Sequence, residues 1–313
     1  MIIELPKSFE AKTAFMFSSK ISDFCESKEE LTFRFNDKVN AQPAGLLLIG
    51  TSLRNMKEFK KIRFDNISEY SYLGSMGFFH SIKEDKGIPI ERLKGSDRFI
   101  PITRKDIVEE CRKDFLDNGG TGNPEDIIEN IARVISKLLS NVDKKLYETC
   151  YYSIVEIIRN VHDHSGKSVL WYSAQYWPSK GKVEIAILDE GCGILSSFKK
   201  SHKYKHLESD YDAICESVKE GVTRSNLKQA GLDYSENTGY GLFKIKSICE
   251  IGGELTITSG NTSIIFAHGD TLKYESNLKG TMISITLYED RVISRKEELD
   301  DLLHPKVKND GKR

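Results

Sequence analysis

The sequence lacks the features that direct a protein into a membrane, out of the cell or onto a nucleic acid. No apolar run in its 313 residues approaches the roughly 20 residues that span a bilayer. The N-terminus has neither the basic start nor the apolar core of a signal peptide. The formal net charge of −1 supplies no global field that would attract nucleic acid or an anionic membrane. We therefore expect a cytoplasmic protein with neither of these partners.

Paired cysteines are also lacking. The six cysteines are scattered along the chain, and none forms a Cys-x-x-Cys pair. This spacing is typical of reduced thiols and argues against a disulfide framework or a cysteine zinc site. The chain has no internal repeat and no low-complexity tract. With 39% hydrophobic and 30% charged residues it has an ordinary globular composition, and its length suits about two domains.

Residues 1–90 are expected to form a small α/β domain. Phe9–Phe17 and Leu31–Phe35 have strand character, and the second alternates apolar and polar residues as a half-solvated strand does. Pro43 is then suited to the first turn of an apolar helix. Residues 91–123, rich in charge, glycine and turns, are expected to be a linker with one short strand at 98–102.

Residues 124–305 are expected to form the second domain, followed by a frayed polar tail at 306–313. Asn123 and Pro124 begin it with a helix-capping amide and a proline in the first turn. The patterns predict helices, a hairpin, a long polar stretch and further strands. Their expected ranges are 124–139, 143–164, 168–177 with 182–189, 194–238 with a helix at 210–220, 242–251, 254–259, 264–267 and 281–287.

A polar cluster lies on the expected helix 143–164. Its members recur at i, i+4, i+7 and i+8 and so share one face: Glu156, Asn160, Asp163 and His164. The apolar neighbours are expected to face a core instead: Ile154, Ile157, Ile158 and Val161. The amide oxygen of Asn160 suits Mg²⁺, and Glu156 could accept a proton from water. A solvated helix face would give the same pattern.

Two glycine-containing turns complete the candidate site. Asp189 ends an apolar strand, where its carboxylate could accept the exocyclic amine of adenine, and Gly191 and Gly193 let the backbone approach a ligand. Gly239 and Gly241 lead directly into a helix, whose free N–H groups would favour an anion. Each turn alone is also consistent with an ordinary loop that binds nothing.

Taken in order, these segments resemble the GHKL ATPase superfamily, which includes the ATP-binding domains of gyrase-type enzymes, chaperones, mismatch-repair proteins and histidine kinases. The resemblance covers residues 124 to 290 and four short motifs. The matching residues are Glu156, Asn160 and Asp163, then Asp189, Gly191 and Gly193, then Gly239, Gly241 and Leu242, and finally Gly280 and Thr281.

The resemblance implies an α+β chain whose C-terminal domain is a Bergerat-type sandwich, a mixed sheet with one helical layer. It implies Mg-ATP as the ligand, with Asp189 on the adenine amine, Asn160 on Mg²⁺ and Glu156 as the general base. Thr281 would support Asp189 through a water. The remaining residues expected around the nucleotide are Asp163, His164, Gly191, Gly193, Ile194, Thr238, Gly239, Tyr240, Gly241 and Leu242.

Residues 194–238 become the mobile ATP lid in this reading. Thr223 and Arg224 could reach the phosphates when the lid closes, and an arginine there would offset charge on the transferred phosphoryl group. Arg224 could equally be a surface charge. The histidine pair His162 and His164 points in different directions from a helix and is not expected to bind a metal.

The N-terminal domain resembles STAS domains, as in anti-sigma factor antagonists. The resemblance rests on the strand Leu31–Phe35, the following loop, and Ala44-Gly45-Leu46 at the start of a helix. A serine phosphorylated by a partner kinase often precedes that glycine in the family. Ala44 stands there in this chain, so this phosphoswitch is expected to be absent.

These features predict a regulatory ATPase that uses nucleotide as a conformational switch, read by another protein or by a second copy of the chain. Two alternatives remain open from sequence. One is a protein serine/threonine kinase of the anti-sigma-factor type, which the pairing with a STAS-like domain favours. The other is a nucleotide sensor that binds without turnover. A histidine kinase is disfavoured because helix 124–139 contains no histidine.

Overall fold

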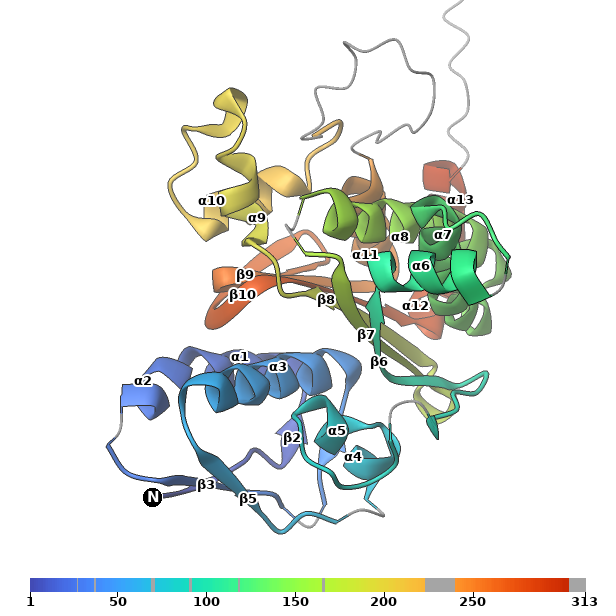
Figure 1. Cartoon of the computed structure of the whole chain (residues 1–313). Helices are drawn as coiled ribbons and strands as arrows, with labels where there is room; N and C mark the ends of the chain where they lie inside the picture. The colour runs from blue at the N-terminus through green and yellow to red at the C-terminus, as the bar shows by residue number, and fades with distance from the viewer. Residues whose placement is uncertain are drawn as a thin grey trace, which may run out of the picture.

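The structure is a computed structural model of the whole chain (Figure 1). It describes residues 1–26, 28–36, 38–68, 71–89, 92–117, 119–164, 167–222 and 240–303. Helices and strands mix throughout, which confirms the α+β class at the level of secondary structure. In the described residues no helix is both long enough and apolar enough to cross a membrane.

The N-terminal unit is built on a small parallel sheet with the strand order β1-β3-β5. Helix α3 begins at Pro43, as predicted, and most of its residues are buried. Its elements are β1 (Ile2–Glu4), β2 (Ser8–Phe9), α1 (Ala11–Ser19), α2 (Ile21–Glu26), β3 (Leu31–Arg34), β4 (Asn40–Ala41), α3 (Pro43–Phe59), β5 (Ile62–Asp65), α4 (Tyr72–Ser75) and α5 (Phe78–Ser81).

The expected strand at Phe9–Phe17 is wrong, because helix α1 occupies most of this range. Ala14, Phe15 and Ser18 are buried and recur at helical spacing, so one side of the helix faces the core. Within this range only Phe9 belongs to a strand, β2, and it pairs with Ala41 of β4.

The C-terminal unit is built on a five-stranded sheet with the strand order β6-β7-β8-β10-β9. Each neighbouring pair runs antiparallel, so the expectation of a mixed sheet is wrong. Strand β6 comes from the expected linker and forms one edge of this sheet. The strands are β6 (Phe99–Asp106), β7 (Val169–Trp177), β8 (Lys182–Asp189), β9 (Gly253–Ala267) and β10 (Asp270–Tyr288).

Strands β9 and β10 form one long hairpin in place of the expected short strands around an insertion. Pairing runs from Asp270 and Ala267 at the turn to Leu287 and Gly253 at the base. Register shifts between Glu275 and Thr281 absorb the irregular part without ending the ladder.

Helices cover one face of the large sheet (Figure 1). Helix α7 begins as predicted, with the Asn123 side chain accepting a hydrogen bond from Glu125 N–H. The remaining elements are α6 (Ile107–Asp117), α7 (Pro124–Ser136), a 3₁₀ turn (Lys137–Asn141), α8 (Lys144–His164), a 3₁₀ turn (Pro178–Lys180), α9 (Gly193–Phe198), a 3₁₀ turn (His202–Tyr204), α10 (Asp210–Ser217), α11 (Gly241–Gly252), α12 (Glu289–Ser294) and α13 (Lys296–Leu303).

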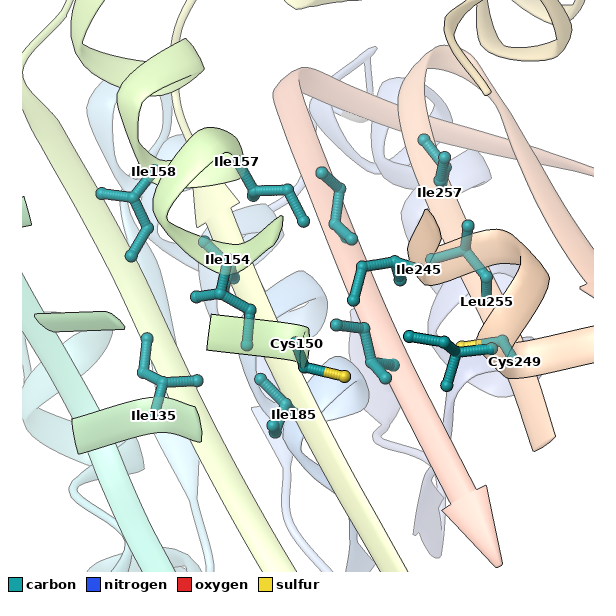
Figure 2. Close-up of a cluster of buried hydrophobic side chains, with 14 of the residues drawn as sticks. Ile135, Cys150, Ile154, Ile157, Ile158, Ile185, Ile245, Cys249, Leu255 and Ile257 are labelled. Carbon is teal, nitrogen blue, oxygen red and sulfur yellow. The ribbon is translucent and has the colours of Figure 1, made fainter. Parts of the chain in front are cut away.

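The main core lies between these helices and the sheet. Figure 2 shows Ile154 and Ile157 of α8 and Ile245 of α11 over Ile185 and Leu255 of the strands. The buried thiols Cys150 and Cys249 belong to the same cluster, and Ile135 of α7 extends it. Helices α8 and α11 are thereby fixed side by side on the sheet, which sets the distance between the residues that each carries.

The opposite face of the sheet is covered by helices of the N-terminal unit, an arrangement that the sequence did not predict. Helix α1 packs on β10, and helix α3 packs on β7, β8 and β10 (Figure 1). A second hydrophobic core joins the two units across this face and includes Leu47, Leu48, Trp171, Leu188 and Met282. The strands are buried on both faces, which explains the nearly continuous apolar run of β8.

A buried acidic side chain fastens this packing. Glu184 of β8 is only 3% exposed, and its Oε1 accepts the backbone N–H of Ala44 at 3.0 Å, in the first turn of α3. Its Oε2 lies 2.9 Å from the ammonium of Lys182, which also donates to Gln42. The carboxylate therefore satisfies a helix N-terminus, where a negative charge is favourable.

Candidate functional site

Residues of all four predicted motifs meet at one pocket, between α8, the end of β8, the middle of β10, and the starts of α9 and α11. The pocket is lined by Ile157, Asn160, Val161, Ile187, Asp189, Gly193, Ile194, Leu242, Thr281 and Ile283. Six of these were expected to bind nucleotide: Asn160, Asp189, Gly193, Ile194, Leu242 and Thr281. Residues up to 126 positions apart in sequence thus share one hollow (157 to 283).

Asp189 is the buried acid of the pocket, with 5% of its surface exposed. The backbone N–H of Gly191 donates to its Oδ1 at 2.7 Å, which fixes the carboxylate at the end of β8. Thr281 is its register partner on β10. The aspartate and the threonine are therefore placed side by side by the strand pairing alone.

Gly280 permits the close approach of β10 to this loop. Its φ of +125° is disfavoured for other residues, and a Cβ there would lie 2.0 Å from the backbone oxygen of Asp189. Gly193 has a φ of +76° and begins α9. Both glycines therefore serve the backbone path around Asp189.

Ser259 of β9 was not predicted, although it ties these segments together. Its buried hydroxyl accepts Ile194 N–H at 2.9 Å and donates to the Gly280 carbonyl at 3.1 Å. The serine thereby joins the start of α9 to the middle of β10. A lone serine carries no sequence signal for this role.

Glu156 does not line the hollow but contacts its wall. Its Oε2 accepts the backbone N–H of Gly241 at 3.0 Å, at the first residue of α11. A Cβ at position 241 would meet the glutamate side chain at 3.0 Å, so glycine lets the helix approach. The Glu156 carboxylate thus accepts a hydrogen bond from the helix end that was expected to bind an anion.

The walls of the pocket include apolar side chains that were assigned to the core alone. Ile157 and Val161 are buried in the main core and also line the hollow, one turn apart on α8. Ile187 and Ile283 line it from β8 and β10. Their helical and alternating spacing signals burial, and spacing does not distinguish a core from a dry pocket wall.

The other expected residues lie around or beyond this hollow. Gly191 lies in the bend before α9, Tyr240 precedes α11, and Gly241 is the first residue of α11. Asp163 is exposed on α8 and is not among the lining residues, and His164 ends that helix. The expected contacts from the lid and second glycine turn fall outside the described residues: Thr223, Arg224, Thr238 and Gly239.

The residues that line the pocket could hold a hard cation only weakly, because they do not form a cage of protein ligands. Within the described ranges, no three His, Cys, Asp or Glu side chains gather as metal ligands. Asn160 is among the lining residues. Its amide oxygen could contribute one ligand to a Mg²⁺ ion held mainly by water and phosphate oxygens.

The hollow is small, with a volume of about 40 Å³. That is room for a few water molecules, since one needs about 10–15 Å³ by this measure. Comparisons of the chain with protein-family models, with curated proteins and with solved structures find no match. Function is therefore inferred from the pocket and its residues.

Proposed function

We propose that the chain binds Mg-ATP in this pocket and hydrolyses it, as a nucleotide-driven switch of the GHKL type. The observation that carries the proposal is the meeting of Asp189, Asn160 and Thr281 around one hollow with apolar walls. A few convergent polar groups on an otherwise apolar lining are typical of small-molecule sites. Ile157 and Ile283 would lie against the faces of a purine ring.

Asp189 would select adenine. Its carboxylate is held by Gly191 N–H, and a carboxylate can accept several hydrogen bonds at once. A hydrogen bond from the exocyclic amine of adenine would use this capacity, whereas guanine presents a carbonyl at the same edge. The fixed orientation of Asp189 is what makes this discrimination sharp.

Asn160 would contact the magnesium ion, and Glu156 would act one helical turn away as the general base. In this step water bonds to the terminal phosphorus, Glu156 takes the water proton, and the bond to the ADP oxygen breaks. The magnesium nucleotide supplies the activated phosphoanhydride and part of the charge neutralisation. The chain supplies position, a proton acceptor and a pocket with little water.

Nucleotide entry requires the hollow to widen, because about 40 Å³ does not hold a purine. The contact between Glu156 and Gly241 holds the first turn of α11, which carries Leu242, against the pocket. We expect this contact to break on binding, so that Glu156 can turn toward the attacking water. Binding without turnover would make the chain a sensor, the second candidate.

Calorimetric titration with ATP and GTP in the presence of Mg²⁺ tests the proposal, together with Asp189→Asn. Asparagine keeps an oxygen for Gly191 N–H but can present an N–H₂ group to adenine. We expect about 10- to 100-fold weaker ATP binding by the variant, the range for a hydrogen bond to a charged group. No ATP binding by the unmodified chain would contradict the proposal.

Labelled ATP then separates the possible activities. Released phosphate indicates the ATPase, phosphate transferred to a protein indicates the kinase, and binding without either indicates the sensor. Lys273→Ala, on the exposed part of β10, serves as a control for unrelated surface changes.

A further inference from the structure

A second and larger cavity lies between the two units, on the opposite face of the sheet from the nucleotide pocket. Its volume is about 570 Å³, within the range of small-molecule sites. Helix α3 and the end of α5 line it from the N-terminal unit. Strands β6, β7 and β10 and the residue after β8 line it from the C-terminal unit.

The cavity is strongly basic, although the chain as a whole has a net charge of −1. Five of its lining side chains are cationic and two are anionic, namely Arg54, Lys83, Arg104, Lys167 and Lys279 against Glu58 and Glu190. Two pairs offset their charges within the lining, Lys83 with Glu58 at 3.4 Å and Arg54 with Glu190 at 2.6 Å. Arg104 also lies 4.0 Å from Asp106, which is outside the lining. A surplus of positive charge in a cleft concentrates anions there.

An ordered network forms the floor of the cavity. Arg54 is 7% exposed, donates to Ser81 O at 2.9 Å and lies 2.6 Å from Glu190 Oε1. Its guanidinium stacks over the Trp171 ring at 4.1 Å, and the indole N–H donates to Glu190 Oε2 at 3.2 Å. The floor is therefore pre-arranged, while Lys167 and Lys279 are exposed.

We propose that this interdomain cavity binds a small molecule that carries a phosphate group. A phosphate dianion matches the charge surplus, and lysine and arginine are the side chains that bind it best. The five cations come from five separate segments, so they surround a ligand instead of lining one exposed helix face. Lys279, Lys167 and Arg104 would hold the phosphate above the Arg54–Glu190 pair.

The position of this site relative to the nucleotide pocket follows from the strand register, and its bearing on nucleotide binding rests on the proposed function. Asp189 lines the nucleotide pocket, and Trp171, the register partner of the preceding residue Leu188, lines the cavity. Successive residues of a strand face opposite sides of its sheet. The two sites therefore lie back to back across the end of β8.

The test uses Trp171 as a reporter in Trp177→Phe, because these are the two tryptophans of the chain. Titration with pyrophosphate, inorganic phosphate and ribose 5-phosphate, without nucleotide, should change its fluorescence in a saturable way. The compound that binds most tightly shows whether the site prefers free phosphate or an organic phosphate. Calorimetry on the unmodified chain checks that the reporter substitution is harmless.

Lys279→Ala and Lys167→Ala test the location. Both residues are exposed, so the variants should fold, and each should weaken binding by about tenfold. Lys273→Ala, on the same strand but outside the cavity, should leave binding unchanged. The absence of saturable binding, or equal binding by the Lys279 and Lys273 variants, would overturn the proposal. Neither result depends on ATP binding, so the nucleotide proposal stands or falls separately.

Discussion

The carboxylate of Glu156 accepts the backbone N–H of Gly241 at 3.0 Å, so the candidate general base caps the helix that borders the pocket. In the proposed reaction this side chain would also accept a proton from water. If nucleotide binding displaced Oε2 from the helix end, that end would need another partner, and a phosphate group is suited to this.

Glu156→Gln should stop hydrolysis while preserving ATP binding. Glutamine keeps an oxygen for Gly241 N–H but is not a base, so kcat should fall by about 10²–10⁴-fold. Phosphate release and calorimetric affinity, measured on the same preparation, check this. Glu148→Gln, exposed on the same helix, is the matched control. Turnover that survives in Glu156→Gln would remove Glu156 from the catalytic role.

Asn160→Ala should weaken ATP binding only when magnesium is present. Loss of the amide oxygen removes one contact to the ion, so the affinity with Mg²⁺ should fall by about tenfold. The affinity in excess chelator should be unchanged. Asn130→Ala, exposed on α7, is the control. An equal loss in both conditions would mean that Asn160 contacts the nucleotide itself or supports the fold.

Gly280→Ala should destabilise the fold much more than Gly269→Ala. Both glycines have positive φ, but a Cβ at 269 meets nothing within 4 Å, whereas one at 280 would lie 2.0 Å from Asp189 O. We expect losses in the free energy of unfolding of about 1 kcal/mol at 269 and about 3 kcal/mol or more at 280. Denaturant unfolding measures both, and similar values would contradict the close approach.

Glu184→Ala should weaken the attachment of the two units. Its side chain is 3% exposed and that of Lys182 13%, so removing the acid leaves a largely buried ammonium without its anion. The expected cost is about 3–5 kcal/mol of unfolding free energy. Glu109→Ala, in an exposed pair with Lys113, should cost at most about 1 kcal/mol. Comparable losses at the two sites would show that the Glu184 contact is not buried in solution.

The cysteines should differ in their reaction with an alkylating reagent at pH 8. Burial raises the pKa of the Cys150 thiol to about 12, and it raises the pKa of Cys249 well above its ordinary value. Both stay protonated at pH 8, and the thiolate is the reactive form. Mass spectrometry should find Cys25, which is exposed, modified first. Modification of Cys150 in the folded chain would contradict the packing of α8 on α11.

The sequence was informative where local chemistry decides structure. Pro43 and Asn123 mark the starts of α3 and α7 as predicted, because a proline or a capping amide acts within one turn. The assignment of Phe9–Phe17 failed because a short run of large apolar residues fits a strand or a buried helix equally well. The hairpin β9–β10 was read as broken because Gly260 and Gly280 resemble turns, whereas both lie within the ladder.

For the candidate site, the polar residues were predictable and their enclosure was not. Asn160 and Asp189 stand out because amides and acids are unusual next to apolar runs, and both line the pocket. Ser259 could not be predicted, because its role depends on the distance between two segments that the tertiary fold brings together. The covering of the second face by α1 and α3 is likewise a long-range result.

The buried joint between the two units restricts how this chain can evolve. The apolar side chains of α3 complete the core on one face of the large sheet, and Glu184 is matched to an amide of that same helix. A recombination that exchanged the first 90 residues for an unrelated module would leave that face of the sheet uncovered and Glu184 without its amide partner. Each unit therefore depends on the other for a complete core, and a substitute for either must reproduce the shape of the lost surface.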